Sequence, residues 1–352
     1  MANKMAQKET IPSNLEEIFR GKLNKVFLYI TDRCNLRCPW CLMGEPEGLD
    51  FPLDDINNIL DWTKSMGAYD LTLIGGEPTI HPELFSIIRS AKDKDFKIVA
   101  LDSNGTFDSS MFDSPDFCSL DKLCISLDAP TPEMHDYSRG RQGLFKKATD
   151  NLRQSLKKGL YTKITFTASN RNVHLASDMV KFAAELGVDE LNFHLISRTG
   201  RGLYNDVVPD TRKWLDNCLR TLELYRKITP NLKLRIPVQF IEKEDFDKIK
   251  PHKCVSWEAD RILFFPNGNI YSCSLLIGSK NTLGRYENGS FILDLNKNSE
   301  LCRYHKNKTP RDSSESDVCP VQSDPESPHF ESDSNLVPLC VSYKPAGGIL
   351  NE

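Results

Sequence analysis

The sequence predicts an α/β fold in which β-α units repeat along a parallel sheet. Short runs rich in β-branched and aromatic residues alternate with stretches in which apolar residues recur every three or four positions. Six such units can be counted before residue 200, a pattern typical of parallel strands joined by crossover helices. Five of the eleven cysteines lie after residue 250, which indicates a smaller, cysteine-rich second region.

Each predicted strand is followed by a predicted helix. The strands are expected at Lys25–Ile30, Asp70–Ile74, Phe96–Leu101, Lys122–Leu127, Lys163–Ala168 and Glu190–Ile196. Helices are expected, among others, at Leu53–Met66, Pro82–Lys92 and Leu175–Leu186. In the first of these helices, Ile56, Ile59 and Leu60 have the spacing of a single buried helix face.

Three cysteines follow the first predicted strand. Cys34, Cys38 and Cys41 have the spacing C-x3-C-x2-C directly after an apolar run. Three thiolates on one loop can hold three irons of a cubane cluster and leave the fourth iron open for a substrate or cofactor. The alternative is a zinc site closed by a fourth Cys or His, but the chain has no second C-x2-C pair, and His81 is distant in sequence. The spacing therefore favours an iron–sulfur site.

Composition restricts the class of protein. The 352 residues are 39% hydrophobic, with a formal net charge of −4. No run approaches the roughly 18 apolar residues of a membrane span, and the first residues contain no apolar signal segment. We therefore expect a cytoplasmic protein that binds neither membranes nor nucleic acid in general, and whose cysteines bind metal or stay free.

Four motifs, in order, resemble those of the radical S-adenosylmethionine (SAM) superfamily. The cysteine run has the family's C-x3-C-x-Φ-C form, in which Trp40 is the aromatic residue. The other motifs are Gly75-Gly76-Glu77-Pro78, then Ser103-Asn104-Gly105, then Ser126-Leu127-Asp128 followed by His135-Asp136 and Arg139. The resemblance implies a partial (β/α)6 TIM-like barrel, with ligands bound at the carboxyl ends of its strands.

The resemblance also implies a cofactor for the cysteines. They would bind a [4Fe-4S] cluster whose open iron takes SAM, with Trp40 beside it. Gly75 and Gly76 are expected to let the backbone approach SAM closely, and Glu77 to accept a hydrogen bond from its ammonium group. An ordinary strand-to-helix turn is the alternative for the two glycines.

Four further side chains are expected to contact SAM. Ser103, Asn104 and Ser126 carry short hydroxyl and amide groups suited to ribose or carboxylate, although each also fits a common turn. Arg139 is expected to bind the SAM carboxylate through two hydrogen bonds, with a solvated surface arginine as the alternative.

Four segments are expected along the chain. Residues 1–24 form an N-terminal extension, 25–210 the barrel, 211–250 a linker with a helix and a strand, and 251–352 the second domain. In the second domain, Cys254, Gly268 and Cys273 have the spacing C-x13-G-x4-C, which resembles the opening of SPASM and twitch extensions. Asn267-Gly268 between apolar runs predicts a β-hairpin there.

Such extensions hold auxiliary iron–sulfur clusters, so one auxiliary [4Fe-4S] cluster is expected. Its expected ligands are Cys254, Cys273, Cys319 and Cys340. Cys302 is left as a spare buried residue or as a catalytic hydrogen-atom donor to a substrate radical. The remaining Cys118, Cys124 and Cys218 lie in predicted core segments and are expected to act as small hydrophobic residues.

The resemblance implies an oxidoreductase or epimerase that cleaves SAM reductively. An electron from a donor such as flavodoxin or ferredoxin would produce a 5′-deoxyadenosyl radical, which takes a hydrogen atom from the substrate. The expected substrate is a small polar natural product, because only about two dozen residues precede the first strand. A ribosomally made peptide, which would be cross-linked or epimerised, is the alternative. A non-catalytic electron-transfer protein is disfavoured because it needs no SAM motifs.

Overall fold

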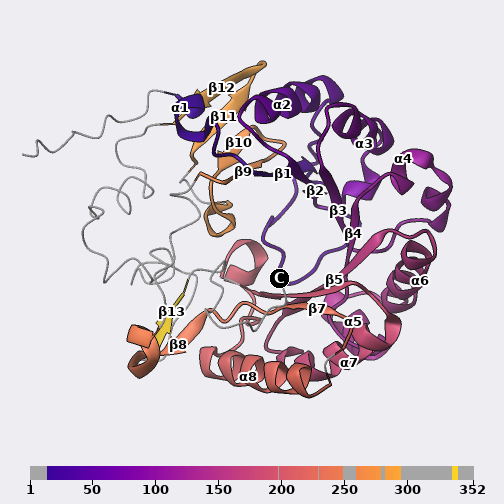
Figure 1. Ribbon diagram of the computed structural model, residues 1–352, viewed down its shortest axis with the longest axis vertical. Coiled ribbons are helices and arrows are strands. Elements are labelled where there is room, and N and C mark those ends of the chain that lie inside the picture. The colour runs from indigo at the N-terminus through magenta and orange to yellow at the C-terminus, as the bar shows by residue number, and fades with distance from the viewer. Residues whose placement is uncertain are drawn as a thin grey trace, which may run out of the picture.

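The computed structural model describes residues 14–196, 198–228, 230–248, 259–278, 282–294 and 335–339. A parallel sheet is curved inside a ring of helices, as Figure 1 shows. Cys254, Cys302, Cys319 and Cys340 lie outside the described residues. In the part of the chain that is described, no helix has the length and apolar character of a membrane span.

Seven strands of the main sheet run parallel in chain order. They are β1 (Lys25–Thr31), β2 (Asp70–Gly75), β3 (Ile98–Ser103), β4 (Lys122–Ser126), β5 (Tyr161–Ala168), β6 (Glu190–Leu195) and β7 (Lys233–Arg235). All six predicted strands are confirmed, with bounds that differ by no more than two residues. The predicted linker strand is β7, which extends the same sheet beyond β6.

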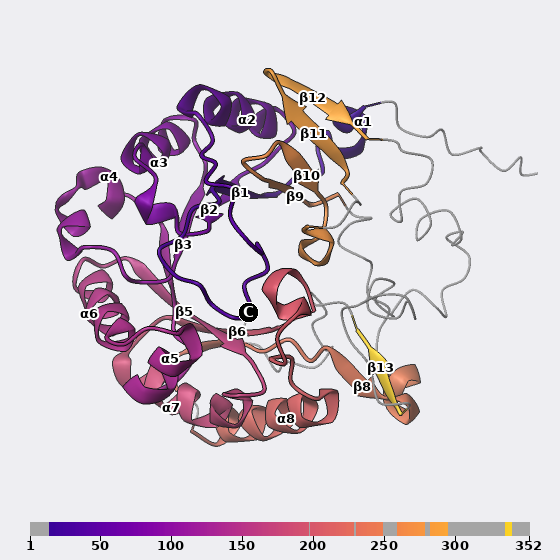
Figure 2. The same cartoon turned by 180° about the vertical axis from the view of Figure 1, so that it is seen from behind.

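Helices cover the outer side of this sheet, as both views show (Figures 1 and 2). They are α2 (Leu53–Ser65), α3 (Leu84–Asp93), α4 (Pro115–Cys118), α6 (Leu144–Lys157), α7 (Ala176–Leu186) and α8 (Thr211–Ile228). The shorter α1 (Leu15–Phe19) precedes β1, and α5 (Pro132–Arg139) follows β4. The predicted helix at Leu53–Met66 is therefore α2, and its expected face is buried at Ile56, Ile59 and Leu60.

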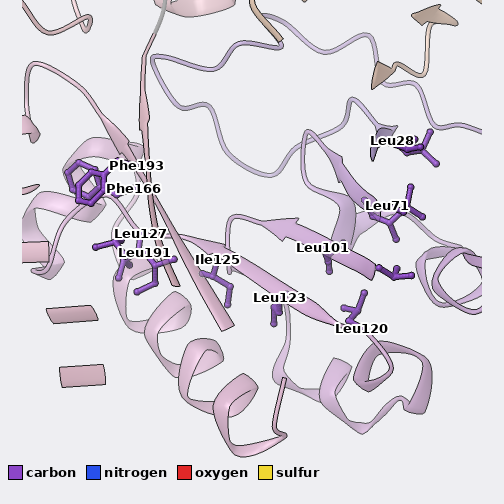
Figure 3. Packing of buried hydrophobic residues seen from close by; sticks show 14 of the residues in the cluster. Leu28, Leu71, Leu101, Leu120, Leu123, Ile125, Leu127, Phe166, Leu191 and Phe193 are labelled. Carbon is purple, nitrogen blue, oxygen red and sulfur yellow. The ribbon is translucent and has the colours of Figure 1, made fainter. Parts of the chain in front are cut away.

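The main apolar core lies between the strands and these helices. Leu71, Leu101, Leu123, Ile125 and Leu191 are each 0% exposed and belong to one cluster. Figure 3 shows these side chains on β2, β3, β4 and β6. Because side chains alternate across a strand, the residues between them face the inner side of the sheet.

The second region continues the same sheet on the other side of β1. Strand β9 (Arg261–Phe264) pairs in parallel with β1, and β10 (Asn269–Tyr271), β11 (Gly284–Glu287) and β12 (Ser290–Leu293) follow as antiparallel neighbours. The predicted Asn267-Gly268 hairpin is confirmed between β9 and β10, where Gly268 has a φ of +83°. In the order of this sheet β7 and β12 are the two ends, so the sheet forms an open, partial barrel.

Aromatic contacts hold this added part against the helices. Trp62 of α2 stacks on Phe291 of β12 with ring centroids 4.4 Å apart. The Tyr286 hydroxyl donates to a carboxylate oxygen of Asp55 at 2.8 Å. A separate two-stranded sheet pairs β8 (Phe240–Glu242) with β13 (Leu336–Pro338). The fold class expected from the sequence is confirmed, and its second part is joined edge to edge with the barrel.

Candidate active site

Cys34, Cys38 and Cys41 lie on a loop that leaves β1 and returns to it. Thr31 and Asp50 form an isolated antiparallel bridge at the base of this loop, which we call the cysteine loop (residues 32–50). Next to the bridge, the Asp32 N–H donates to the Leu49 carbonyl at 3.0 Å. The loop is therefore closed by backbone hydrogen bonds at the carboxyl end of β1.

Two charged side chains stabilise the cysteine loop further. The Asp32 carboxylate accepts backbone N–H groups of Glu47, Gly48 and Leu49 at 2.7, 3.0 and 2.7 Å. Arg33 donates two hydrogen bonds to the Asp50 carboxylate, at 3.0 and 2.6 Å. Charge-assisted bonds of this kind are stronger than neutral ones. The chain thus holds the loop in shape through its own contacts.

Gly75 and Gly76 contact the start of the cysteine loop. A Cβ on Gly75 would lie 2.3 Å from the Thr31 carbonyl oxygen, and one on Gly76 would lie 2.2 Å from that of Arg33. The Gly76 N–H donates to the Thr31 carbonyl, and the Glu77 N–H to that of Arg33, both at 2.8 Å. The space beside both glycines is therefore filled by protein backbone. Their expected approach to SAM stays a prediction.

Glu77 is fully buried and is bound within the protein. Its Oε1 accepts the Thr79 N–H at 3.2 Å and the Ser103 hydroxyl at 2.8 Å. Its Oε2 accepts the Asn104 N–H at 2.7 Å. Burial raises the pKa of Glu77, although these hydrogen bonds oppose the shift. The carboxylate expected to receive the SAM ammonium thus links the ends of β2 and β3.

The amide groups of Asn35 and Asn104 connect this network to the cysteine loop. The Asn104 side-chain amide donates to Asn35 Oδ1 at 2.8 Å, and that of Asn35 donates to the Thr106 hydroxyl at 2.8 Å. Asn35 lies directly after Cys34, so these bonds fix the loop beside its first thiol. Sequence reasoning missed Asn35, because an asparagine between two cysteines carries no signal of its own.

The three thiols lie near one another and near one cation. Burial raises the pKa of Cys34, and it raises that of Cys38 to about 11, while the nearby Arg139 lowers both. Each of these thiols is also influenced by Cys41. Among the described residues, no group of side chains is placed to hold a single metal ion. In a cubane cluster each thiolate binds a different iron, so three neighbouring, partly exposed thiols fit that cofactor.

Trp40 is buried in a small apolar cluster next to Cys38. Its side chain is 7% exposed and belongs to a small apolar cluster with Ile196 and Val207. Cys38 packs against this cluster. Trp40 therefore packs the cysteine loop, to which it belongs, against the segment that follows β6. Its expected contact with SAM stays a prediction.

Arg139 is buried, so the surface alternative for this residue is wrong. Its side chain is 8% exposed, and its Nε donates to Asp128 Oδ2 at 2.6 Å. Burial by itself lowers the pKa of Arg139, but Asp128 and the Cys38 thiol raise it above its ordinary value. Arg139 is thus a permanent cation beside Cys34 and Cys38.

His135, four residues earlier on α5, packs against the same acid. Its Nδ1 accepts the Asp128 N–H at 3.0 Å, and its Nε2 is buried with no partner among the described residues. Burial lowers the pKa of His135 to about 4, so the ring is neutral at pH 7.

A row of polar side chains crosses the inner side of the sheet. Asp102, Cys124, Lys163 and Glu190 are paired in register on β3, β4, β5 and β6. Burial by itself lowers the pKa of Lys163, but Cys124, Asp102 and Glu190 raise it above its ordinary value, Cys124 also through a hydrogen bond. Ser126 lies one inward position closer to the carboxyl ends, paired with Thr165. Cys124 thus lies between charged groups, contrary to the expected apolar surroundings.

The opposite part of the inner side is apolar. Tyr29 stacks on Phe265 with ring centroids 3.9 Å apart, in a cluster that includes Tyr271. Cys273, the described member of the expected auxiliary ligand set, packs against this cluster together with Leu42 of the cysteine loop. The structure therefore places Cys273 and the cysteine loop against one apolar cluster.

Comparison with known proteins assigns the first part of the chain. The family model of the radical SAM superfamily matches residues 28–183, which extend from β1 into α7. This segment is therefore similar to the radical SAM superfamily. The cysteine loop, the two glycines and the ends of β3 and β4 all lie within the matched segment.

Individual relatives cover more of the chain. The subtilosin biosynthesis protein AlbA of Bacillus subtilis is 26% identical over 77% of this chain and 59% of its own length. The AdoMet-dependent heme synthase of Methanosarcina barkeri is 29% identical over 51% of this chain and 52% of its own length. This chain thus spans little more than half of these relatives.

A solved structure shares the fold. Streptococcus suis SuiB, bound to its precursor peptide SuiA, superposes with a TM-score of 0.64 at 15% identity. The match covers 76% of this chain and 63% of SuiB. At this identity the likeness concerns the fold, and it extends beyond the segment that the family model matches.

We expect Gly76→Ala to prevent assembly of the cluster. The new Cβ would lie 2.2 and 2.5 Å from the carbonyl oxygens of Arg33 and Asp32, so the cysteine loop must move. The measurement is iron per protein after anaerobic reconstitution. Gly187→Ala is the control, because its φ of +78° carries a backbone cost but nothing lies within 4 Å. Full iron in Gly76→Ala would contradict the packing role.

His135 should make the apoprotein less stable in acid. Its pKa falls from 6.5 unfolded to about 4 folded, so its stabilising contribution is present above pH 6.5 and is lost as pH falls toward 4. Asn keeps an acceptor near Nδ1 and does not titrate. The difference in unfolding free energy between wild type and His135→Asn should therefore shrink by roughly 3 kcal/mol over that range. Urea unfolding at several pH values measures it, and parallel curves would contradict a buried neutral histidine.

Proposed function

We propose that this chain cleaves SAM reductively at a [4Fe-4S] cluster held by Cys34, Cys38 and Cys41. The observation that carries the proposal is the cysteine loop itself. Its three thiols lie together at the carboxyl end of β1, on a backbone fixed by its own hydrogen bonds, beside a buried cation. The cluster would supply the electron that breaks the sulfonium bond and the open iron that takes the amino acid part of SAM.

The residues around the loop would orient SAM. Arg139, the last residue of α5, carries a charge suited to the SAM carboxylate, and Ser126 at the end of β4 has a hydroxyl facing the inner side. Ser103 and Asn104 are buried and bound to Glu77, so their part is to keep the ends of β2 and β3 together. Flavodoxin or ferredoxin would be the electron donor.

The C-terminal region would hold an auxiliary [4Fe-4S] cluster. Support comes from Cys273, which packs against the same apolar cluster as Leu42 and Met43 of the cysteine loop. A cluster at Cys273 would lie on the same side of the barrel as the loop, where it could accept an electron from a substrate radical. Cys254, Cys319 and Cys340 would be its other ligands, and Cys302 would be left for hydrogen-atom donation.

The substrate would enter on the polar inner side of the sheet. The cationic Lys163 and the buried Oδ1 of Asp102, which has no partner among the described residues, suit a polar substrate group. A polar lining favours a polar compound, which the enzyme would oxidise or epimerise. AlbA, whose name assigns it to bacteriocin biosynthesis, favours the second candidate, a ribosomally made peptide.

SAM cleavage should depend on the three loop cysteines. Replacing Cys34, Cys38 and Cys41 by Ala should abolish both iron binding and 5′-deoxyadenosine formation, because the cluster loses its thiolate ligands. Reconstituted protein with dithionite and SAM gives the assay. Cys218→Ala is the control, because Cys218 is buried in α8 within the main core. Product from the triple variant would overturn the proposal.

A second assay separates the two substrate candidates. Extracts of cells that naturally make this protein are tested before and after protease digestion. The readout is the stimulation of 5′-deoxyadenosine formation. A low-molecular-mass, protease-resistant stimulant identifies a small polar compound, whereas loss of stimulation after digestion identifies a peptide. The loop-cysteine variant serves as the blank, and equal stimulation of the blank would show that neither fraction acts through the proposed site.

A further inference from the structure

Arg139 is held through one of its three nitrogens. Its Nε donates to Asp128 at 2.6 Å, and neither Nη1 nor Nη2 bonds to a residue that the structure describes. Nη1 and Nη2 are absent from the set of buried polar atoms that lack a partner, so both reach solvent-accessible space. The guanidinium therefore has its two-pronged edge available while its third nitrogen is bound.

Asp128 is itself fixed on every side. Its second carboxylate oxygen, Oδ1, accepts the Thr167 N–H at 2.9 Å, from the end of β5. Its backbone carbonyl accepts the Asn172 amide at 2.8 Å, and its N–H donates to His135 at 3.0 Å. The side chain is 0% exposed. The carboxylate thus has little freedom to move, and neither does the Nε that it binds.

Arg139 lies near the expected cluster ligands. Two residues later in the chain, Arg141 donates to the Asn35 carbonyl of the cysteine loop at 3.4 Å, and the charge of Arg139 acts on the thiols of both Cys34 and Cys38. The nearby Glu77 carboxylate is already bound within the protein. The two parallel N–H groups of a guanidinium match the two oxygens of a carboxylate. A guanidinium whose plane is already fixed loses less conformational entropy on binding than a mobile one.

We propose that Asp128 is a positioning residue, which orients Arg139 so that Nη1 and Nη2 receive the carboxylate of SAM. The inference rests on the proposed function, since it concerns how SAM is held at the same site. An ion pair with a purely structural role would support the fold alone and would treat all SAM analogues alike. Asp128 instead should act on the carboxylate of the bound molecule and on nothing else in it.

Two ligands separate these roles. SAM and decarboxylated SAM share the adenosine, the sulfonium and the amino group, and differ in the carboxylate. Dissociation constants of both are measured by equilibrium dialysis with anaerobically reconstituted wild type and Asp128→Asn. We expect Asp128→Asn to bind SAM about tenfold to a hundredfold more weakly and to leave decarboxylated SAM nearly unchanged, as for loss of a charge-assisted contact.

Two further variants serve as controls. Asp136→Asn removes another α5 carboxylate, one that caps α6 through Gly143 and Phe145, and should leave the preference for SAM intact. Asp128→Glu keeps the charge in the core but displaces Nε, so it should lose the preference as well. It provides the measurement if Asp128→Asn does not fold.

The outcomes are distinct. Equal weakening of both ligands, or an unchanged preference for SAM in Asp128→Asn and Asp128→Glu, would overturn the positioning role while the proposed function stands. Wild-type protein that binds SAM no better than decarboxylated SAM would overturn the carboxylate contact itself. Wild type with a full iron complement that binds neither ligand would overturn the proposed function and this inference with it.

Discussion

The close contact between Gly75-Gly76 and the start of the cysteine loop is the constraint on which the site depends. Strands β1 and β2 run side by side, and the pairing register shifts between Tyr29 and Thr31, just before the loop begins. The irregularity turns the chain toward the end of β2, where side chains are absent and backbone groups bond directly. From there Glu77 connects to β3, and Asn104 connects back to the loop. The thiols are therefore placed by the register of three parallel strands.

The buried ion pair of Asp128 and Arg139 is not explained by stability alone. Removing two charges from water costs several kcal/mol per ion, and an apolar pair of similar volume is often as stable. A buried ion pair is thus poor evidence for a stabilising role. Here the two terminal nitrogens of the arginine have no partner among the described residues and reach solvent-accessible space. The buried pair can be explained if a third group, an anion, binds the two terminal nitrogens of Arg139.

The sequence predicted local features well and long-range ones poorly. Strand and helix positions followed from apolar periodicity, and the Asn267-Gly268 hairpin from its turn residues, because these signals are local. The parallel pairing of β9 with β1 was not predicted, because more than two hundred residues separate the two strands and neither sequence indicates which strand it pairs with. For the same reason Arg139 could not be assigned to the interior. Its burial depends on Asp128 and on packing contributed by several segments.

The inner side of the sheet could be predicted least well from local sequence patterns. In strand β5, Lys163 and Thr165 alternate with Ile164 and Phe166, a pattern that predicts one buried and one solvated face. The structure turns the second face inward, so Lys163 and Thr165 face the interior of the barrel. His194 on β6 is exposed although its strand has neighbours on both sides, so solvent reaches this inner face. A barrel interior filled with branched apolar side chains would be more stable. A polar, solvent-reached interior next to the thiols is better explained by a polar molecule that enters it.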